Sequence, residues 1–199
     1  MANDFYSVLK ERRSYYGLNK DVQVSDERIK EIVEFAVKHT PSAFNSQTAR
    51  LVVLTGEAHD QLWEITTETL REVVGNGDFT GTQEKMDSFK AGYGTVLFFE
   101  DEAVVKSLQE QFSAYAENFP VWSNQASGMH QLVVWAGLEA EGLGASLQHY
   151  NPLIDEEVKN KWNIPGNWKL IAQMPFGNPT AEPGEKQFQA VEDRVKFYK

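Results

Sequence analysis

Apolar residues at the helical period of 3.6 recur along most of this chain, and only short apolar runs between them can form strands. Two helices are expected to begin after the caps Asn3 and Ser25, and three more are expected over 57–74, 102–117 and 125–141. The expected strands are 51–54, 95–100, 144–149 and 169–175. Long helices with so few short strands indicate an α+β or α/β fold with a small sheet.

The length of 199 residues suits a single domain, 1–199, with enough residues to bury a core. The last segment, QFQAVEDRVKFYK (187–199), is expected to be an extended tail that leaves the compact part. No apolar run is long enough for a signal peptide or a membrane span, so a cytoplasmic protein with no membrane partner is expected.

Charge and cysteine content exclude several function classes. Lys plus Arg is 19 and Asp plus Glu is 29, so the net charge is 19 − 29 = −10. A general nucleic-acid partner is therefore not expected, because phosphate backbones need a basic face. There is no cysteine, which excludes disulfides, thiolate catalysis and thiolate metal sites. The chain also contains no phosphate-binding P-loop, His-x-x-x-His pair or nucleophile elbow.

A basic cluster, Arg12-Arg13-Ser14, stands at the predicted end of the first helix. Two guanidinium groups and a hydroxyl can make several charge-assisted hydrogen bonds to a phosphate monoester. The alternative is a solvated helix end, where cations favour the helix dipole. A second basic pair, Arg194 and Lys196, would point to the same side of an extended tail, unless that terminus is simply frayed and solvated.

Polar residues are dense in two further segments. The loop from Pro41 to Gln47 carries Ser42 and Asn45, which suit a polar heterocycle or polyol, or form turns that end the helix. The segment after Gly142 carries Leu147, Gln148, His149, Tyr150 and Asn151 before a proline. It lacks the spacing of a dinucleotide fingerprint. His149 could act as a general base or pack as a structural histidine.

In this order and at this spacing, the four segments resemble the nitroreductase family of FMN enzymes, over essentially the whole chain. The resemblance implies an α+β, three-layer homodimer with a small mixed sheet flanked by helices. It assigns Arg12, Arg13 and Ser14 to the flavin phosphate and ribityl chain, and Arg194 and Lys196 to the phosphate. It further assigns flavin contacts from the other subunit to Pro41, Ser42, Asn45 and Gln47, and contacts to the isoalloxazine ring to the strand end Leu147, Gln148, His149, Tyr150 and Asn151.

The sequence also departs from better-known members. Tyr16 stands where an arginine or lysine is usual, and the loop continues Gln-Thr-Ala-Arg where many have Gln-Pro-Trp. These departures resemble a short branch that includes fungal and copper-induced bacterial nitroreductases. The group that stabilises reduced flavin is left open, with Lys90 and Lys85 as candidates.

The resemblance implies noncovalent FMN, with NADPH or NADH as the electron donor. Nitroaromatics or quinones are the expected acceptors, reduced in a ping-pong scheme that needs no protein nucleophile. Tyr115, Phe119 and Trp122 could line an aromatic acceptor pocket, or pack in the core or in the dimer interface. The alternatives to the enzyme are a flavin-binding or redox-stress protein without rapid turnover and a flavin-free interaction protein.

Overall fold

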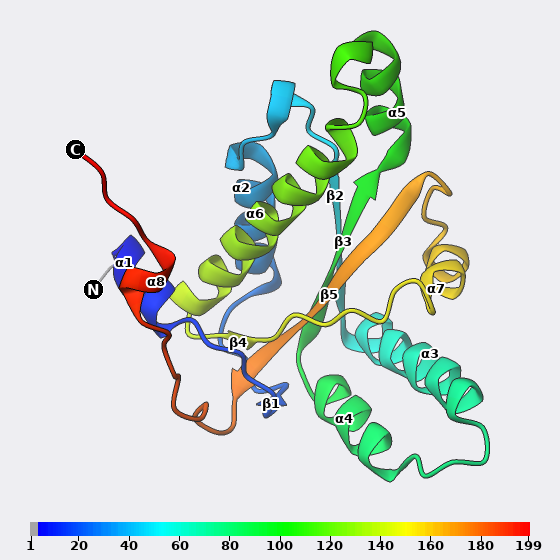
Figure 1. Cartoon of the computed structure of the whole chain (residues 1–199). Helices are drawn as coiled ribbons and strands as arrows, with labels where there is room; N and C mark the ends of the chain where they lie inside the picture. Colours follow the sequence, from blue (N-terminus) through cyan, green and yellow to red (C-terminus); the bar gives the residue numbers. More distant parts are fainter. Residues whose placement is uncertain (1–3) are drawn as a thin grey trace.

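The computed structural model describes residues 4–199. The elements in chain order are α1 (Phe5–Glu11), β1 (Leu18–Asn19), α2 (Asp26–His39), the 3₁₀ turn η1 (Ala43–Asn45), β2 (Ala49–Thr55), α3 (Gly56–Val74), α4 (Thr80–Lys90), β3 (Gly94–Asp101), α5 (Glu102–Gln111), the 3₁₀ turn η2 (Ser113–Tyr115), α6 (Phe119–Ala140), β4 (Gly144–Ala145), α7 (Asp155–Trp162), β5 (Trp168–Pro179) and α8 (Val191–Arg194). Helices flank a small sheet (Figure 1), which confirms the expected fold class.

The sheet has the strand order β1-β5-β3-β2, and β4 pairs with β5 beside that path. All pairings between these named strands are antiparallel. A single parallel bridge joins Ser14 to Ala145, so the mixed character that we expected is confined to one residue pair. The strand expected over 144–149 is limited to Gly144–Ala145, because beyond it only Gln148 makes a bridge, to Gln173 of β5.

Strand β3 is buried along its whole length and separates two cores. Successive side chains of a strand point to opposite faces. Val96 and Phe98 therefore pack with residues of α2 and α6, whereas Leu97 and Phe99 pack with residues of α3, α4 and α7. The result is three layers with the sheet in the middle (Figure 1).

Local sequence signals explain most of the helix ends. Ser25 caps α2 as expected, and its Oγ accepts a hydrogen bond from the Arg28 N–H at 3.2 Å. Asn3, the expected cap of α1, lies outside the described residues, and Asp4 accepts from the first-turn amides instead. The helix expected over 125–141 begins earlier, at Phe119, because Pro120 is well tolerated in a first turn. The helix expected over 102–117 ends at Gln111.

A buried histidine joins α3 to the sheet. His59 is fully buried, with Nε2 3.2 Å from the Lys90 carbonyl and Nδ1 2.9 Å from the Thr95 hydroxyl. The carbonyl can only accept, so Nε2 carries the proton and Thr95 donates to Nδ1. The Thr95 oxygen in turn accepts from the Trp63 indole at 3.0 Å. Burial lowers the pKa of His59 from 6.5 to about 4.

The first prediction concerns this histidine and pH. Because the folded pKa lies below the unfolded one, the unfolded chain binds more protons between pH 6.5 and 4. Stability is therefore retained above pH 6.5 and lost as pH falls toward 4, by about 3 kcal/mol from His59 alone. Urea unfolding across this range should show a smaller decline for His59→Asn than for the native chain. His39→Asn, at an exposed site, is the control, and equal declines in all three proteins would contradict the assignment.

Candidate functional site

Strand β5 positions the residues that follow α1. Arg12 leaves the helical conformation, with φ −53° and ψ 117°, and the chain then runs along the sheet. The Tyr15 N–H donates to the Ala145 carbonyl at 3.0 Å, and the Gly17 carbonyl accepts from the Thr180 N–H at 3.0 Å. The basic cluster is therefore fixed beside the end of β5, although more than 160 residues separate the two in sequence.

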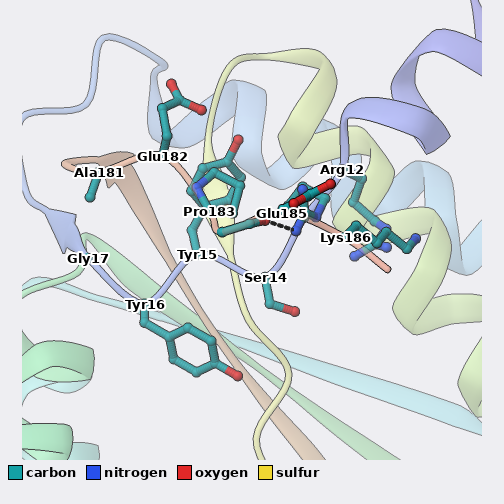
Figure 2. Close-up of a pocket in the computed structure, with 12 residues that line it drawn as sticks. Arg12, Ser14, Tyr15, Tyr16, Gly17, Ala181, Glu182, Pro183, Glu185 and Lys186 are labelled. Carbon is teal, nitrogen blue, oxygen red and sulfur yellow. Dashed lines mark hydrogen bonds between the residues drawn. The ribbon is translucent and has the colours of Figure 1, made fainter. Parts of the chain in front are cut away.

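A surface depression of about 580 Å³ lies between these two segments (Figure 2). Residues 12–17 form one wall and residues 181–186 form the other. The Arg13 guanidinium donates to the Gly184 carbonyl and ties the walls together. The volume of this depression is in the range of small-molecule and cofactor sites.

The depression brings three cations together with two carboxylates. The cations are Arg12, Arg13 and Lys186, and the carboxylates are Glu182 and Glu185. The Arg12 Cζ lies 4.3 Å from the centroid of the Trp135 ring. The Lys186 Nζ lies 5.3 Å from the Phe188 ring. Among residues 4–199, none of these cations is within ion-pair distance of a carboxylate. Their charge is therefore available to an anion.

Lys186 is a site residue that the sequence analysis did not single out. It follows Pro183-Gly184 in a turn-rich segment, and a cation directly after such a turn is the signal that could have found it. Figure 2 shows Lys186 at the same end of the depression as Arg12, whereas the Tyr16 ring points away from both. The depression thus has a basic end and an aromatic end.

Aromatic rings continue from Tyr16 into the protein. The Tyr16 ring is 54% exposed and its centroid lies 6.4 Å from that of Phe89. The ring centroids of Phe89 and Trp63 are 4.8 Å apart, and those of Trp63 and Tyr150 are 5.9 Å apart in an edge-to-face arrangement. Burial, together with a smaller effect of the nearby Tyr16, raises the pKa of Tyr150 to about 12. The structure thus brings two predicted site residues, Tyr16 and Tyr150, into one aromatic group.

The predicted strand end 147–151 is held by one buried glutamine. The backbones of Gln148 and Gln173 bond reciprocally, at 2.7 and 2.9 Å. The Gln173 Oε1 accepts from the Tyr150 N–H at 2.7 Å, and its Nε2 donates to the Asn151 Oδ1 at 3.4 Å. Leu147 is half-buried and His149 is exposed. None of the residues 147–151 lines the depression.

The Pro41–Gln47 loop has an unusual backbone. Phe44, Asn45 and Gln47 have φ of 56°, 49° and 47°, a left-handed region that costs energy for residues with a Cβ. The Ser42 Oγ accepts from the Gln47 N–H at 3.0 Å, and Arg50 donates to the Gln47 carbonyl at 2.8 Å. The loop is therefore held in a costly conformation that leaves the Asn45 and Gln47 side chains exposed.

An aromatic cluster and a buried acid hold this loop against α6. The Phe44 ring has four aromatic neighbours at 5.0–5.9 Å: Phe112, Tyr115, Phe119 and Trp122. Directly after the loop, the Thr48 Oγ1 lies 3.3 Å from the Ser123 Oγ, which bonds the Glu100 carboxyl. Burial raises the pKa of Glu100. The aromatic residues expected to line a pocket therefore surround the loop, with Phe44 and Tyr115 about half exposed.

Four predicted cations, Arg194, Lys196, Lys90 and Lys85, do not line the depression. Arg194 and Lys196 are exposed, and the Lys196 Nζ donates to the Glu192 carbonyl at 2.7 Å. Lys90 forms an ion pair with Glu64 at 2.7 Å. By contrast, Lys85 has no carboxylate within ion-pair distance in the described part of the chain, and its Nζ lies 5.7 Å from the Phe89 ring, next to Tyr16.

Residues 4–199 contain no cluster of three or more His, Asp or Glu side chains arranged to hold a metal ion. In the same residues, no helix combines the length and the apolar character needed to cross a membrane.

Comparison with known proteins gives the family. Residues 9–178 match the Nitroreductase family. HBN1 of Saccharomyces cerevisiae is 37% identical over 186 residues, which is 92% of each chain. The nitroreductase FRM2 of the same yeast is 32% identical over 190 residues, 94% of each chain. The structure of nitroreductase CinD from Lactococcus lactis in complex with nicotinic acid superposes with a TM-score of 0.93 at 50% identity, covering 98% of this chain and 100% of that one.

The fold and these matches define an oxidoreductase. The chain belongs to the nitroreductase family, as the four sequence segments indicated. Its relatives in a yeast and a bacterium agree with the expected resemblance to a fungal and bacterial branch.

The second prediction concerns the glutamine behind the 147–151 segment. Gln173→Leu should destabilise the protein by about 1–3 kcal/mol, because the Tyr150 N–H loses its acceptor in a half-buried site. Gln131→Leu is the matched control, since within residues 4–199 that buried amide bonds only the Ser127 hydroxyl of its own helix. Urea unfolding measures both variants. Equal losses would mean that Gln173 contributes packing rather than a specific anchor.

Proposed function

We propose that this chain forms a homodimeric, FMN-dependent oxidoreductase that passes electrons from NADH or NADPH to nitroaromatics or quinones. The observation that carries the proposal is the depression with Arg12, Arg13 and Lys186, none of them engaged by a carboxylate within residues 4–199. In a chain of net charge −10, such a cluster suits one small anion and not a polyanion.

The donor set fits the phosphate of FMN. A phosphate monoester offers three acceptor oxygens, and guanidinium and ammonium groups are its usual partners. Arg12, Arg13 and Lys186 would hold this group, with the Ser14 hydroxyl next to it on the same wall. When bound, FMN would supply hydride acceptance from the nicotinamide cofactor and electron transfer to the acceptor in two separate half-reactions.

The aromatic end of the depression would face the ring of the cofactor. Tyr16 lies near Tyr150, and the segment 147–151 is bonded to β5 through the backbones of Gln148 and Gln173. Gln148 and Asn151 offer amide groups, and Tyr150 offers a phenol that stays protonated at neutral pH because burial raises its pKa to about 12. Their role is thus to orient the cofactor by hydrogen bonds and to exclude water, and the protein itself contributes no nucleophile.

The second subunit would complete the site. In one chain, Pro41, Ser42, Asn45 and Gln47 lie outside the depression, as do Arg194 and Lys196 in the tail. For the four loop residues, the family resemblance implies that the flavin they contact is bound mainly by the partner copy. The resemblance assigns Arg194 and Lys196 to the phosphate, and the proposal adds that they reach it from the partner copy. Large apolar side chains exposed on α2 and α6 support a dimer, since burying them against a second copy would remove their apolar surface from water. They are Phe35, Val121, Met129 and Leu132, each 41–58% exposed.

The Pro41–Gln47 loop would also contact the electron acceptor. Phe44 and Tyr115, half-exposed members of the aromatic cluster, offer flat surfaces for an aromatic ring. Structures of CinD in complex with 4-nitrophenol and with chloramphenicol, at 50% identity to this chain, support small nitroaromatic acceptors.

The third prediction tests the function itself. The purified protein should be yellow, and heat should release FMN rather than FAD. With NADH or NADPH, it should reduce 4-nitrophenol or a benzoquinone, and initial rates at several fixed acceptor concentrations should give parallel double-reciprocal lines. Intersecting lines would require a ternary complex. A yellow protein that reduces neither acceptor would favour a flavin-binding role, and a colourless protein that takes up no FMN would overturn the proposal.

The fourth prediction separates the two lysine candidates for the reduced cofactor. A cation near the ring stabilises the anionic reduced form. Lys85 is free of carboxylate partners among residues 4–199 and lies over the Phe89 ring beside Tyr16, whereas Lys90 pairs with Glu64. Lys85→Met should therefore lower the midpoint potential of bound FMN by roughly 20–40 mV, about 1–2 kcal/mol for two electrons. Lys90→Met is the control and should change it little. A larger change for Lys90→Met would reverse the assignment.

A further inference from the structure

We propose that Trp135 of α6 is a positioning residue, which holds the Arg12 guanidinium in the basic depression through the face of its indole ring. The inference rests on the proposed function, because the anion that Arg12 would bind is the phosphate of FMN. Trp135 does not line the depression. It packs against the core on one side, and the Arg12 Cζ lies 4.3 Å from its ring centroid. It would therefore act on the ligand only through Arg12.

The indole makes no other polar contact that would explain its presence. Its Nε1 is buried and has no hydrogen-bond partner in the described part of the chain. Leaving a buried N–H unpaired is costly, and a phenylalanine would fill most of the same space without that cost. What tryptophan offers beyond volume is the most electron-rich face of any side chain, which attracts a cation stacked on it.

An aromatic face holds a cation without neutralising it. Arg28 shows the alternative, because Glu31 and Glu141 bind its guanidinium at 2.8 and 2.7 Å and leave little charge for a ligand. A carboxylate at the position of Trp135 would likewise bind Arg12 and compete with phosphate for the same donors. The indole fixes the guanidinium plane through one face, and the N–H groups at its edge stay open to the anion.

The next turn of α6 reinforces this arrangement. Glu139, four residues after Trp135, lies near Arg12, and its Oε2 is buried with no partner among residues 4–199. Burial and the charge of Glu11 raise its pKa, against the opposing effect of Arg12, and Glu182 raises it as well. The raised pKa makes the charged form of Glu139 less favourable than that of a solvated glutamate, which weakens its competition for the guanidinium. The other titratable groups that line the depression are Arg13, Tyr15, Tyr16, Glu185 and Lys186.

The test compares FMN with riboflavin, which lacks the phosphate. Trp135→Leu should weaken FMN binding about 3- to 10-fold and leave riboflavin binding unchanged. Trp135→Phe keeps a weaker aromatic face and should recover part of the loss. Trp168→Leu is the matched control, because Arg50 lies over that indole at 5.8 Å, outside the depression. Flavin fluorescence titration of the apoprotein gives all the dissociation constants.

A double-mutant cycle with Arg12→Ala separates positioning from a general effect on folding. If Trp135 acts through Arg12, then Trp135→Leu has no further effect on FMN binding once Arg12 is alanine. Additive losses, or equal losses for FMN and riboflavin, would overturn the inference. A Trp135→Phe variant that keeps the native ratio of FMN to riboflavin affinity would also overturn the inference. This second variant keeps the test valid if Trp135→Leu does not fold. If the native protein fails to prefer FMN over riboflavin, the proposed phosphate site is wrong instead.

Discussion

The pairing of β5 with its neighbours is the constraint on which the rest of the molecule depends. This strand pairs with β3, β1 and β4, so it joins the core of the sheet to segments from both ends of the chain. The residues after α1 are fixed where β5 leaves the sheet, and residues 181–186 continue directly from its end. A depression built from two remote segments is thus a consequence of antiparallel register, and Gln173 of the same strand anchors residues 148–151.

Aromatic faces recur as partners of the cations around this site. Arg12 lies over the ring of Trp135, Lys186 over that of Phe188, and Lys85 over that of Phe89. Away from it, Lys20, Arg28 and Lys90 are paired with carboxylates. In an acidic protein, carboxylates are plentiful, so a cation without one retains a charge that would otherwise be screened at close range. Arg50 and Arg71 also lie over aromatic rings away from the site, so an aromatic partner alone does not mark a cation as available to a ligand.

The sequence predicted the layers of the fold well because the long helices have strong periodicity and β3 is a continuous apolar run, which indicates burial on both faces. It predicted the extent of 144–149 poorly, since pairing there depends on how β5 bends past it and not on local propensity. In the site, Arg12 and Arg13 were found as a local cluster. Lys186 was not, because its position relative to them is set by the turn after β5.

The left-handed backbone of the 41–47 loop is the feature that a sequence pattern conceals most completely. None of Phe44, Asn45 and Gln47 is glycine, so each conformation must be held by tertiary contacts. Phe44 is held by four rings and the end of the loop by Arg50, while Thr48 is anchored through Ser123 to the buried Glu100. Such a loop cannot relax easily when a ligand leaves. Its backbone is therefore held in place before binding, which would lower the entropy lost if a planar cofactor contacts the loop as proposed.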